Sequence, residues 1–247
     1  MSTLSKKVAI VTGASRGIGF GLALALLKEG CRVVICSRRE DQIQSAAEEL
    51  VSRAAVPAGF VFAVAADVGV ESDVERLFAS TVERFGCVDL VINNAGNFDG
   101  GPIESLTMEE WENVLGACLT GPFLCTREAF RLMKPRRSGR VLNIGSISAQ
   151  RARMHSVPYT SAKFGVQGLT HAAALEGREF GIIVSCLHPG NVSVERRCDS
   201  DAESDREPMM SVQTIVKAAM AMLTMPDDVN FLDAIVLPSK QDYIGRG

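Results

Sequence analysis

The sequence lacks the features that mark several large classes of protein. It has no uninterrupted run of about 18 apolar residues, the length expected of a membrane-spanning helix. Its formal net charge is −3, so no excess of positive charge indicates a surface for nucleic acid or anionic lipid. The first residues, Met-Ser-Thr-Leu-Ser-Lys-Lys, are too few and too polar for a secretory signal. We therefore expect a cytoplasmic protein that spans no membrane and binds no nucleic acid.

The cysteines also lack the spacing of a metal or redox site. Seven are scattered along the chain without a C-x-x-C pair, so we expect no bound metal. The 247 residues, 47% of them hydrophobic, are enough for one domain with a substantial core. Short apolar runs alternate with amphipathic stretches, and this alternation predicts an α/β fold. We expect a single doubly wound Rossmann domain over residues 1–247, with a mainly parallel seven-stranded sheet and helices on both faces. The expected strands are 7–12, 32–36, 60–65, 88–92, 140–144, 182–187 and 232–237.

The first expected strand ends in a glycine-rich turn that leads directly into a helix. The turn reads Thr-Gly-Ala-Ser-Arg-Gly-Ile-Gly over residues 12–19. Glycine permits a tight turn and close approach of the backbone to a ligand, and the helix N-terminus offers free N–H groups to a pyrophosphate. Because the turn lies between a strand and a helix, it predicts a dinucleotide site. Its residues would be Gly13, Ser15, Arg16, Gly17, Ile18 and Gly19.

The end of the second expected strand indicates which dinucleotide binds. An acidic residue there would bind the 2′-hydroxyl of NAD, whereas this chain has Ser37 and Arg38, with Arg16 in the glycine turn. Two guanidinium groups and a hydroxyl suit a 2′-phosphate, so we predict NADP(H) as the cofactor. Arg39 is more simply interpreted as a solvated residue at the start of the next helix.

A tyrosine and a lysine, Tyr159 and Lys163, lie one helical turn apart in the second half of the chain. A cation about 4 Å from a phenol, at an effective dielectric near 20, would stabilise the phenolate by roughly 4 kcal/mol. Such a pair is a proton donor and acceptor suited to neutral pH. Taken alone the pattern is weak, since a surface tyrosine and lysine one turn apart look the same.

Taken together, the motifs resemble those of the short-chain dehydrogenase/reductase family. The glycine turn at 12–19, Asn-Asn-Ala-Gly at 93–96, Tyr159-x-x-x-Lys163 and Pro189-Gly190 follow the family's order and separations over essentially the whole chain. Ser146 stands where the family keeps its catalytic serine.

The resemblance implies a role for each matching residue. Tyr159 would exchange a proton with the substrate oxygen, Ser146 would hydrogen-bond that oxygen, and Lys163 would hold the nicotinamide ribose and favour the phenolate. The remaining cofactor contacts would be Asp67 and Val68 at adenine, Asn94 with Ala95 and Gly96 at the adenosine-side ribose, and Pro189, Gly190 and Val192 at the nicotinamide. The implied reaction is hydride transfer between NADP(H) and a small-molecule carbonyl or secondary alcohol. Carbonyl reductases and enzymes of 3-hydroxy acids or 3-oxoacyl groups are the types it suggests.

Two positions depart from the family pattern. Members usually have asparagine where Cys118 stands, and a thiol is a weak donor and a poor acceptor. We therefore keep an alternative, an NADP(H)-binding protein with weak or no catalysis. Beyond Gly190, Val194 replaces a frequent threonine, and the neighbouring Ser193 is a candidate substitute.

Other features have plainer interpretations. We expect His188 to be structural, and Arg151 and Arg153 to be surface residues or a clamp for an anionic substrate. Residues 193–211 are rich in charge and resemble a mobile substrate loop. Helices 107–133 and 159–179 are apolar on more than one face, so we expect a homodimer or homotetramer formed through them.

Overall fold

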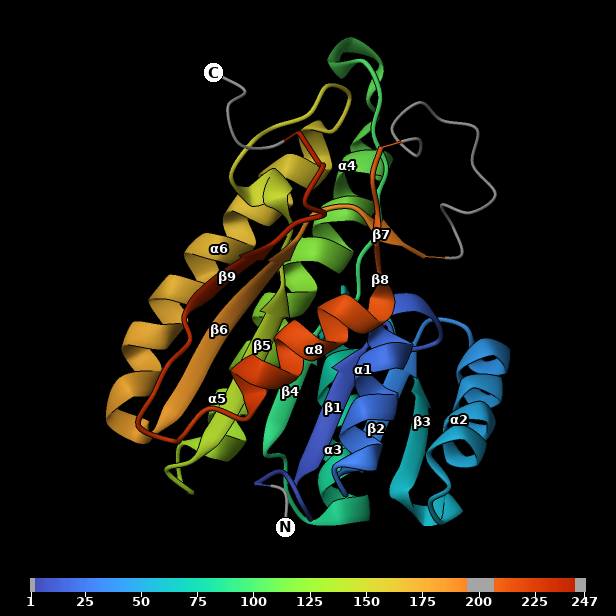
Figure 1. Cartoon of the computed structure of the whole chain (residues 1–247), viewed down its shortest axis with the longest axis vertical. Helices are drawn as coiled ribbons and strands as arrows, with labels where there is room; N and C mark the ends of the chain where they lie inside the picture. Colours follow the sequence, from blue (N-terminus) through green and yellow to red (C-terminus); the bar gives the residue numbers. More distant parts are fainter. Residues whose placement is uncertain (1–2, 195–206, 243–247) are drawn as a thin grey trace.

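The computed structural model describes residues 3–194 and 207–242. Most of the expected substrate loop, from 195 to 206, lies outside the described residues. The main sheet has seven strands in the order β3-β2-β1-β4-β5-β6-β9 (Figure 1). All of its pairings are parallel, where the sequence predicted a mainly parallel sheet. Its strands are β1 (Val8–Thr12), β2 (Arg32–Ser37), β3 (Val61–Ala65), β4 (Leu90–Asn93), β5 (Gly139–Ile144), β6 (Ile182–Pro189) and β9 (Asp233–Val236).

The strands form because both faces of the sheet are covered, so continuous apolar runs are buried. All five residues of β1, for example, are buried. The observed bounds differ from the expected ones by about two residues at most, the usual uncertainty of strand and helix ends. A short second sheet pairs β7 (Val192–Ser193) with β8 (Met210–Ser211) at the two ends of the expected substrate loop.

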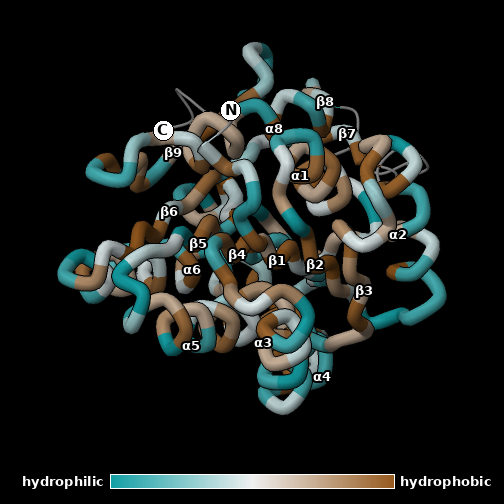
Figure 2. Tube along the Cα trace, turned by 90° about the horizontal axis from the view of Figure 1, so that it is seen from below, coloured by the Kyte–Doolittle hydropathy of each residue, from teal (hydrophilic) through white to brown (hydrophobic). Residues whose placement is uncertain are grey.

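Helices cover both faces of the sheet, and Figure 2 shows the three layers edge-on. One face packs against α1 (Gly17–Lys28), α2 (Glu40–Ala54) and α8 (Val212–Leu223). The other face packs against α3 (Glu71–Phe85), α5 (Gly121–Met133) and α6 (Val157–Gly177). The prediction of a doubly wound α/β fold is confirmed. Within the described residues, no helix is long and apolar enough to cross a membrane.

The expected helix 107–133 is interrupted. It consists of α4 (Met108–Leu115), a π-helical segment η3 (Gly116–Thr120) and α5. The Gly121 N–H bonds to the Gly116 carbonyl, five residues back, instead of four. Single π-turns inside α-helices occur often at functional sites, and this one contains Cys118.

Candidate active site

The glycine turn after β1 is shaped by close contact with the loop after β4. Gly13 and Gly17 have φ values of +63° and +60°, the left-handed region that favours glycine. A Cβ atom added to Gly13 would lie 2.7 Å from the Ala95 Cα, and one added to Gly19 would lie 2.4 Å from the Gly13 carbonyl oxygen. Larger residues would therefore push the two loops apart.

Hydrogen bonds of the Thr12 and Asn94 side chains join these two loops. The Thr12 hydroxyl donates to the Ile92 carbonyl (3.3 Å) and accepts from the backbone N–H groups of Asn94 and Ala95 (both 3.0 Å). The Asn94 side-chain amide donates to the carbonyls of Thr12 (2.9 Å) and Gly13 (3.0 Å). The Asn94 side chain therefore fixes the backbone of the glycine turn. Its contact with a ribose stays a prediction.

The start of α1 has the features of an anion site. The first intrahelical bond runs from the Phe20 N–H to the Arg16 carbonyl (3.3 Å), so the N–H groups of the three preceding residues have no intrahelical acceptor. No acidic side chain lies in the first turn, and no side chain caps it. The predicted residues Gly17, Ile18 and Gly19 thus fit a pyrophosphate, and Ser15 lies half-buried in the turn before them.

Two arginines, Arg16 and Arg38, lie near the same edge of the sheet and pair with no carboxylate of the described residues. The Ala14 N–H bonds to the Cys36 carbonyl (3.2 Å) and so draws the glycine turn to the end of β2. Arg16 and Arg38 are exposed, and among the described residues neither forms an ion pair. Arg39 instead pairs with Asp41 at 2.8 Å. The cations that the sequence assigned to a 2′-phosphate are therefore available for a ligand.

The loop after β3 is fixed by contacts of Asp67 and Val68. The Asp67 carboxylate accepts from the Gly69 N–H (2.9 Å), and Val68 is buried against the start of α5. A Cβ on Gly121 would lie 2.6 Å from the Val68 side chain. These contacts fix the loop at which adenine binding is predicted.

Lys163 is buried between α6 and β5. Its side chain is nearly inaccessible, and its Nζ donates to the Ile144 carbonyl at 2.8 Å. Burial opposes the positive charge, but the phenol of Tyr159 and the thiols of Cys118 and Cys186 raise the Lys163 pKa above its ordinary value. The Nζ lies 5.5 Å from the centre of the Tyr159 ring. The structure therefore brings the tyrosine and a charged lysine together.

Ser146 lies immediately beyond β5 in extended backbone, and it is 9% exposed. Its hydroxyl oxygen accepts from the Ser148 N–H at 3.1 Å. Because that bond uses a lone pair, the hydroxyl hydrogen stays available for an acceptor such as a carbonyl oxygen. The segment that begins at Ser146 packs against α6, which carries Tyr159. The candidate catalytic residues therefore lie close together at the carboxyl edge of the sheet.

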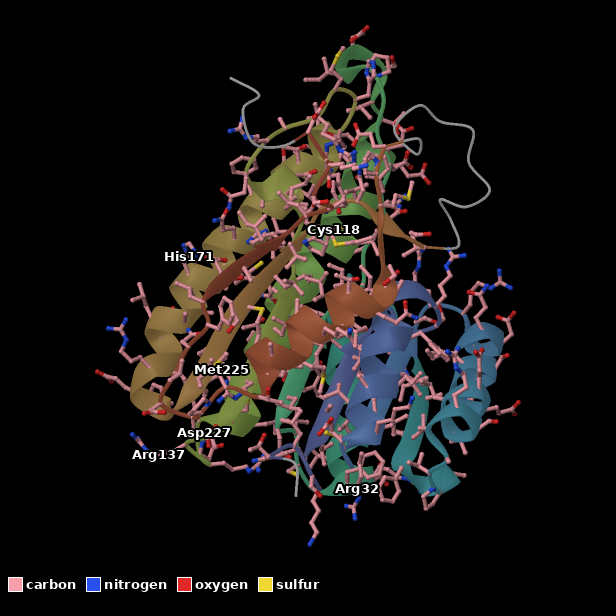
Figure 3. All side chains as sticks on the ribbon, viewed as in Figure 1. Arg32, Cys118, Arg137, His171, Met225 and Asp227 are labelled. Atoms are coloured by element: carbon pink, nitrogen blue, oxygen red, sulfur yellow. The ribbon has the colours of Figure 1, made fainter. Side chains whose placement is uncertain are left out.

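Cys118, which Figure 3 labels, is fully buried. Its thiol donates to the Asn97 carbonyl (3.3 Å) and accepts from the Asn97 N–H (3.4 Å). We expected the thiol to be unable to take over the hydrogen bonds of an asparagine. The structure shows that it makes one bond of each kind, although sulfur forms weaker bonds than an amide. Cys118 also packs with Ala162 against Tyr159.

The predicted nicotinamide loop is tied to the end of the chain. The Gly190 N–H bonds to the Val236 carbonyl (2.8 Å), and the Asn191 N–H bonds to the Gln241 side chain (2.9 Å). A Cβ on Gly190 would lie 2.2 Å from the Gln241 Oε1. Beyond the turn that begins at Pro189, Val192 is buried in β7 and Ser193 is exposed. Their predicted contacts with the nicotinamide stay predictions.

Sequence reasoning missed one neighbour of the catalytic residues, Phe98, and gave another, His188, a structural role only. The Phe98 ring packs edge-on against Tyr159, with centroids 5.1 Å apart, and the guanidinium of Arg153 lies 5.9 Å from Phe98. The His188 ring is fully buried and contacts the backbone of Ser146. A motif search has no signal for Phe98, whereas His188 was noticed and interpreted as structural.

The fold and this site define a class: an α/β dinucleotide-binding protein with a serine, a tyrosine and a lysine at the carboxyl edge of its sheet. Comparison with known proteins narrows the class to a family. Residues 7–205 match the family model described as short chain dehydrogenase. The chain belongs to the short-chain dehydrogenase/reductase family, whose members are oxidoreductases that use a nicotinamide cofactor.

Individual relatives act on different substrates. A 3-oxoacyl-(acyl-carrier-protein) reductase from Synechocystis sp. is 35% identical over 203 residues, which cover 82% of this chain and 81% of the relative. An L-fucose dehydrogenase from Oryctolagus cuniculus is 37% identical over 187 residues, covering 75% of this chain and 63% of the relative. A crystal structure of a variant actinorhodin polyketide ketoreductase with NADPH superposes with a TM-score of 0.86. It is 32% identical and covers 98% of this chain and 100% of its own.

Proposed function

We propose that this protein is an NADP(H)-dependent oxidoreductase that interconverts a carbonyl and a secondary alcohol. The observation that carries the proposal is the group formed by Ser146, Tyr159 and Lys163 next to a glycine turn whose N–H groups are open to a pyrophosphate. NADP(H), when bound, supplies or accepts the hydride, and the protein supplies geometry and a proton.

The side chains divide the remaining work. The Ser146 hydroxyl, which already accepts from Ser148, donates to the substrate oxygen and fixes its position. Tyr159 gives its phenolic proton to that oxygen in reduction and takes it back in oxidation. Lys163 is held charged beside the phenol and stabilises negative charge on the tyrosine oxygen as the proton leaves.

The preference for NADP(H) rests on Arg16 and Arg38. Both guanidinium groups are exposed near the edge where the adenosine ribose would lie, and no acidic residue ends β2. A 2′-phosphate would meet two cations there, as the related NADPH-bound ketoreductase leads us to expect.

The substrate class we favour is a 3-oxoacyl group or a 3-oxo acid. A relative named as a 3-oxoacyl-(acyl-carrier-protein) reductase and another named as a polyketide ketoreductase support this choice. Within this chain, Arg153 lies beside the Phe98 ring that packs on Tyr159, so a cation stands near the reacting group. A carboxylate or phosphate on the substrate would be attracted to it.

The test is NADPH oxidation with quinones, diketones, aldehydes, 3-oxo acids and 3-oxoacyl thioesters. Native protein should reduce one of the last two classes best. Tyr159→Phe should bind NADPH with a Kd within about twofold of native while losing at least 10²-fold in kcat, because it removes the general acid. Retained turnover in that variant would exclude Tyr159 from the mechanism.

Cys118→Asn separates the enzyme from the alternative of a cofactor-binding protein without catalysis. Since the thiol keeps one bond of each kind to Asn97, we expect native turnover, with at most a few-fold gain in the asparagine variant. Turnover in Cys118→Asn alone would show that the thiol disables the site, and a binding role would then be the better account.

We also propose that a second copy of the chain covers the outer face of α5 and α6. Phe123, Phe164 and Leu175 are 47%, 48% and 63% exposed, and a hollow of about 340 Å³ lies between the two helices. Apolar surface of this kind usually marks an interface. Phe164→Glu should convert the oligomer to monomer in sedimentation velocity, whereas Ile103→Glu, an equally drastic change at a 69% exposed residue elsewhere, should not. A native protein that sediments as a monomer would refute the proposal.

A further inference from the structure

We propose that His188, oriented by Asp233, is a positioning residue for the catalytic Ser146. The proposal rests on the proposed function, because Ser146 matters only if the protein catalyses the reaction. It concerns the peptide backbone of the serine, which the mechanism above does not use.

The His188 ring lies directly against that backbone. His188 is near the end of β6 and has no exposed surface. Its Nδ1 is 3.3 Å from the Ser146 backbone nitrogen and 3.0 Å from the Ser146 carbonyl oxygen. Gly145 makes the approach possible, since a Cβ there would lie 2.5 Å from Nδ1 and 2.8 Å from the Cys186 Sγ. The lack of a side chain at Gly145, the residue before the serine, therefore leaves room for the His188 ring.

Asp233 decides which nitrogen of the ring carries the proton. It begins β9, which pairs with β6, and its Oδ1 is 3.3 Å from the His188 Nε2. An ionised carboxylate only accepts hydrogen bonds, so the bond to Asp233 requires a proton on Nε2. In the neutral ring Nδ1 is then an acceptor and binds the Ser146 N–H. The second carboxylate oxygen contacts the His171 Nε2 at 2.5 Å.

A second proton on the His188 ring would change which backbone group of Ser146 it binds. It would sit on Nδ1, which would then donate to the Ser146 carbonyl and no longer accept from the Ser146 N–H. The ring's charge therefore selects which backbone atom of the serine is bound. Because the hydroxyl of the same residue is aimed by its bond from Ser148, turning the backbone would move the hydroxyl away from the substrate oxygen.

Titratable groups lie around the ring on three elements, β6, α6 and β9. The Cys186 thiol faces it from β6, and burial raises the pKa of that thiol to about 12, so it stays neutral. Lys163 lies beyond Cys186 on α6 and stays charged. Asp233 faces the ring from β9, and His171 on α6, 46% exposed at its side chain, joins Asp233 to the surface (Figure 3).

The kinetic test compares two replacements of His188. The Oδ1 of an asparagine can take the place of Nδ1 and accept the Ser146 N–H, whereas leucine cannot. His188→Leu should lower kcat by at least tenfold while NADPH binds within about twofold of native, since misplaced groups slow the chemical step. His188→Asn should recover most of that loss, because its Oδ1 again accepts from the Ser146 N–H. Asp233→Asn should resemble the leucine variant, and His171→Asn should keep native kcat.

A spectroscopic test does not depend on activity. The chain has three histidines, so ¹⁵N-histidine labelling gives three rings, assigned with His155→Gln and His171→Asn. We expect His188 at neutral pH to carry its proton on Nε2 and to change tautomer in Asp233→Asn. A proton on Nδ1, or His188→Asn no more active than His188→Leu, overturns the proposal. If no carbonyl substrate is reduced, the proposed function fails, and the tautomer still decides whether His188 binds the serine as described.

Discussion

Replacing Arg38 by aspartate is the sharpest test of the cofactor assignment. Arg38 is exposed at the end of β2 and has no carboxylate partner among the described residues. The substitution reverses one charge at the place where a 2′-phosphate would bind, and it creates the acidic residue that suits the 2′-hydroxyl of NAD.

The size of the effect follows from the exposure of this site. In a dielectric near that of water, two unit charges about 4 Å apart interact by about 1 kcal/mol. A phosphate ester carries a charge of about −1.5 to −2. Replacing the positive arginine by a negative aspartate changes the interaction energy by twice the amount that removing the arginine charge alone would. Screening at physiological salt, with a Debye length of about 8 Å, removes part of it. We therefore expect kcat/KM to shift from NADPH toward NADH by at least tenfold, or about 1.4 kcal/mol.

The assay is steady-state reduction of one carbonyl substrate with each cofactor, at low and high salt. Arg39→Asp is the matched control, because Arg39 is also exposed but is paired with Asp41 at 2.8 Å. It should change the cofactor ratio by less than about threefold, as exposed pairs contribute little. An equal shift in both variants would show that overall charge, not a phosphate site, sets the preference. A native protein that prefers NADH would refute the assignment outright.

Two further predictions concern stability and the glycine turn. Although burial would raise it, hydrogen bonds from the Val8 N–H and the Arg136 guanidinium hold the Asp89 pKa below its ordinary value. Asp89→Asn should therefore lower the free energy of unfolding by about 2 kcal/mol at pH 7. The difference between native protein and variant should shrink as pH falls through about 4 toward the folded pKa of Asp89. A constant difference in urea melts from pH 7 to pH 3 would contradict this. Gly19→Ala should weaken NADPH binding at least tenfold in fluorescence titrations, since its Cβ has no room. Gly59→Ala, an exposed position where an added Cβ meets no atom within 4 Å, should leave binding unchanged. Native affinity in Gly19→Ala would mean that the two loops can separate without loss of the site.

The sequence was most informative where one residue type is the only one that fits. Gly13 and Gly17 were identifiable because a left-handed turn between a strand and a helix needs glycine. Helix geometry puts Tyr159 and Lys163 on one face, and the resemblance to the family singled the pair out as catalytic. The parallel sheet followed from apolar runs that only a sheet covered on both faces would bury.

Features that depend on distant parts of the chain were not predictable in this way. The π-turn at Cys118 is a change of hydrogen-bond partner that no periodicity reveals. The role of His188 depends on β9, the last strand of the sheet, which places Asp233 beside it. A residue's partners across strands follow from register, and register was not available from the sequence.

The Thr12 hydroxyl joins the glycine turn to the loop after β4 through bonds between protein groups alone, and this has a consequence for binding. A loop that orders only around its ligand weakens the affinity by the entropy it loses, whereas these two loops are already joined in the folded chain. The dinucleotide therefore does not have to supply the bonds that join the two loops. Thr12→Val would keep the shape but release the Asn94 and Ala95 N–H groups, and its cost should appear as a more unfavourable binding entropy.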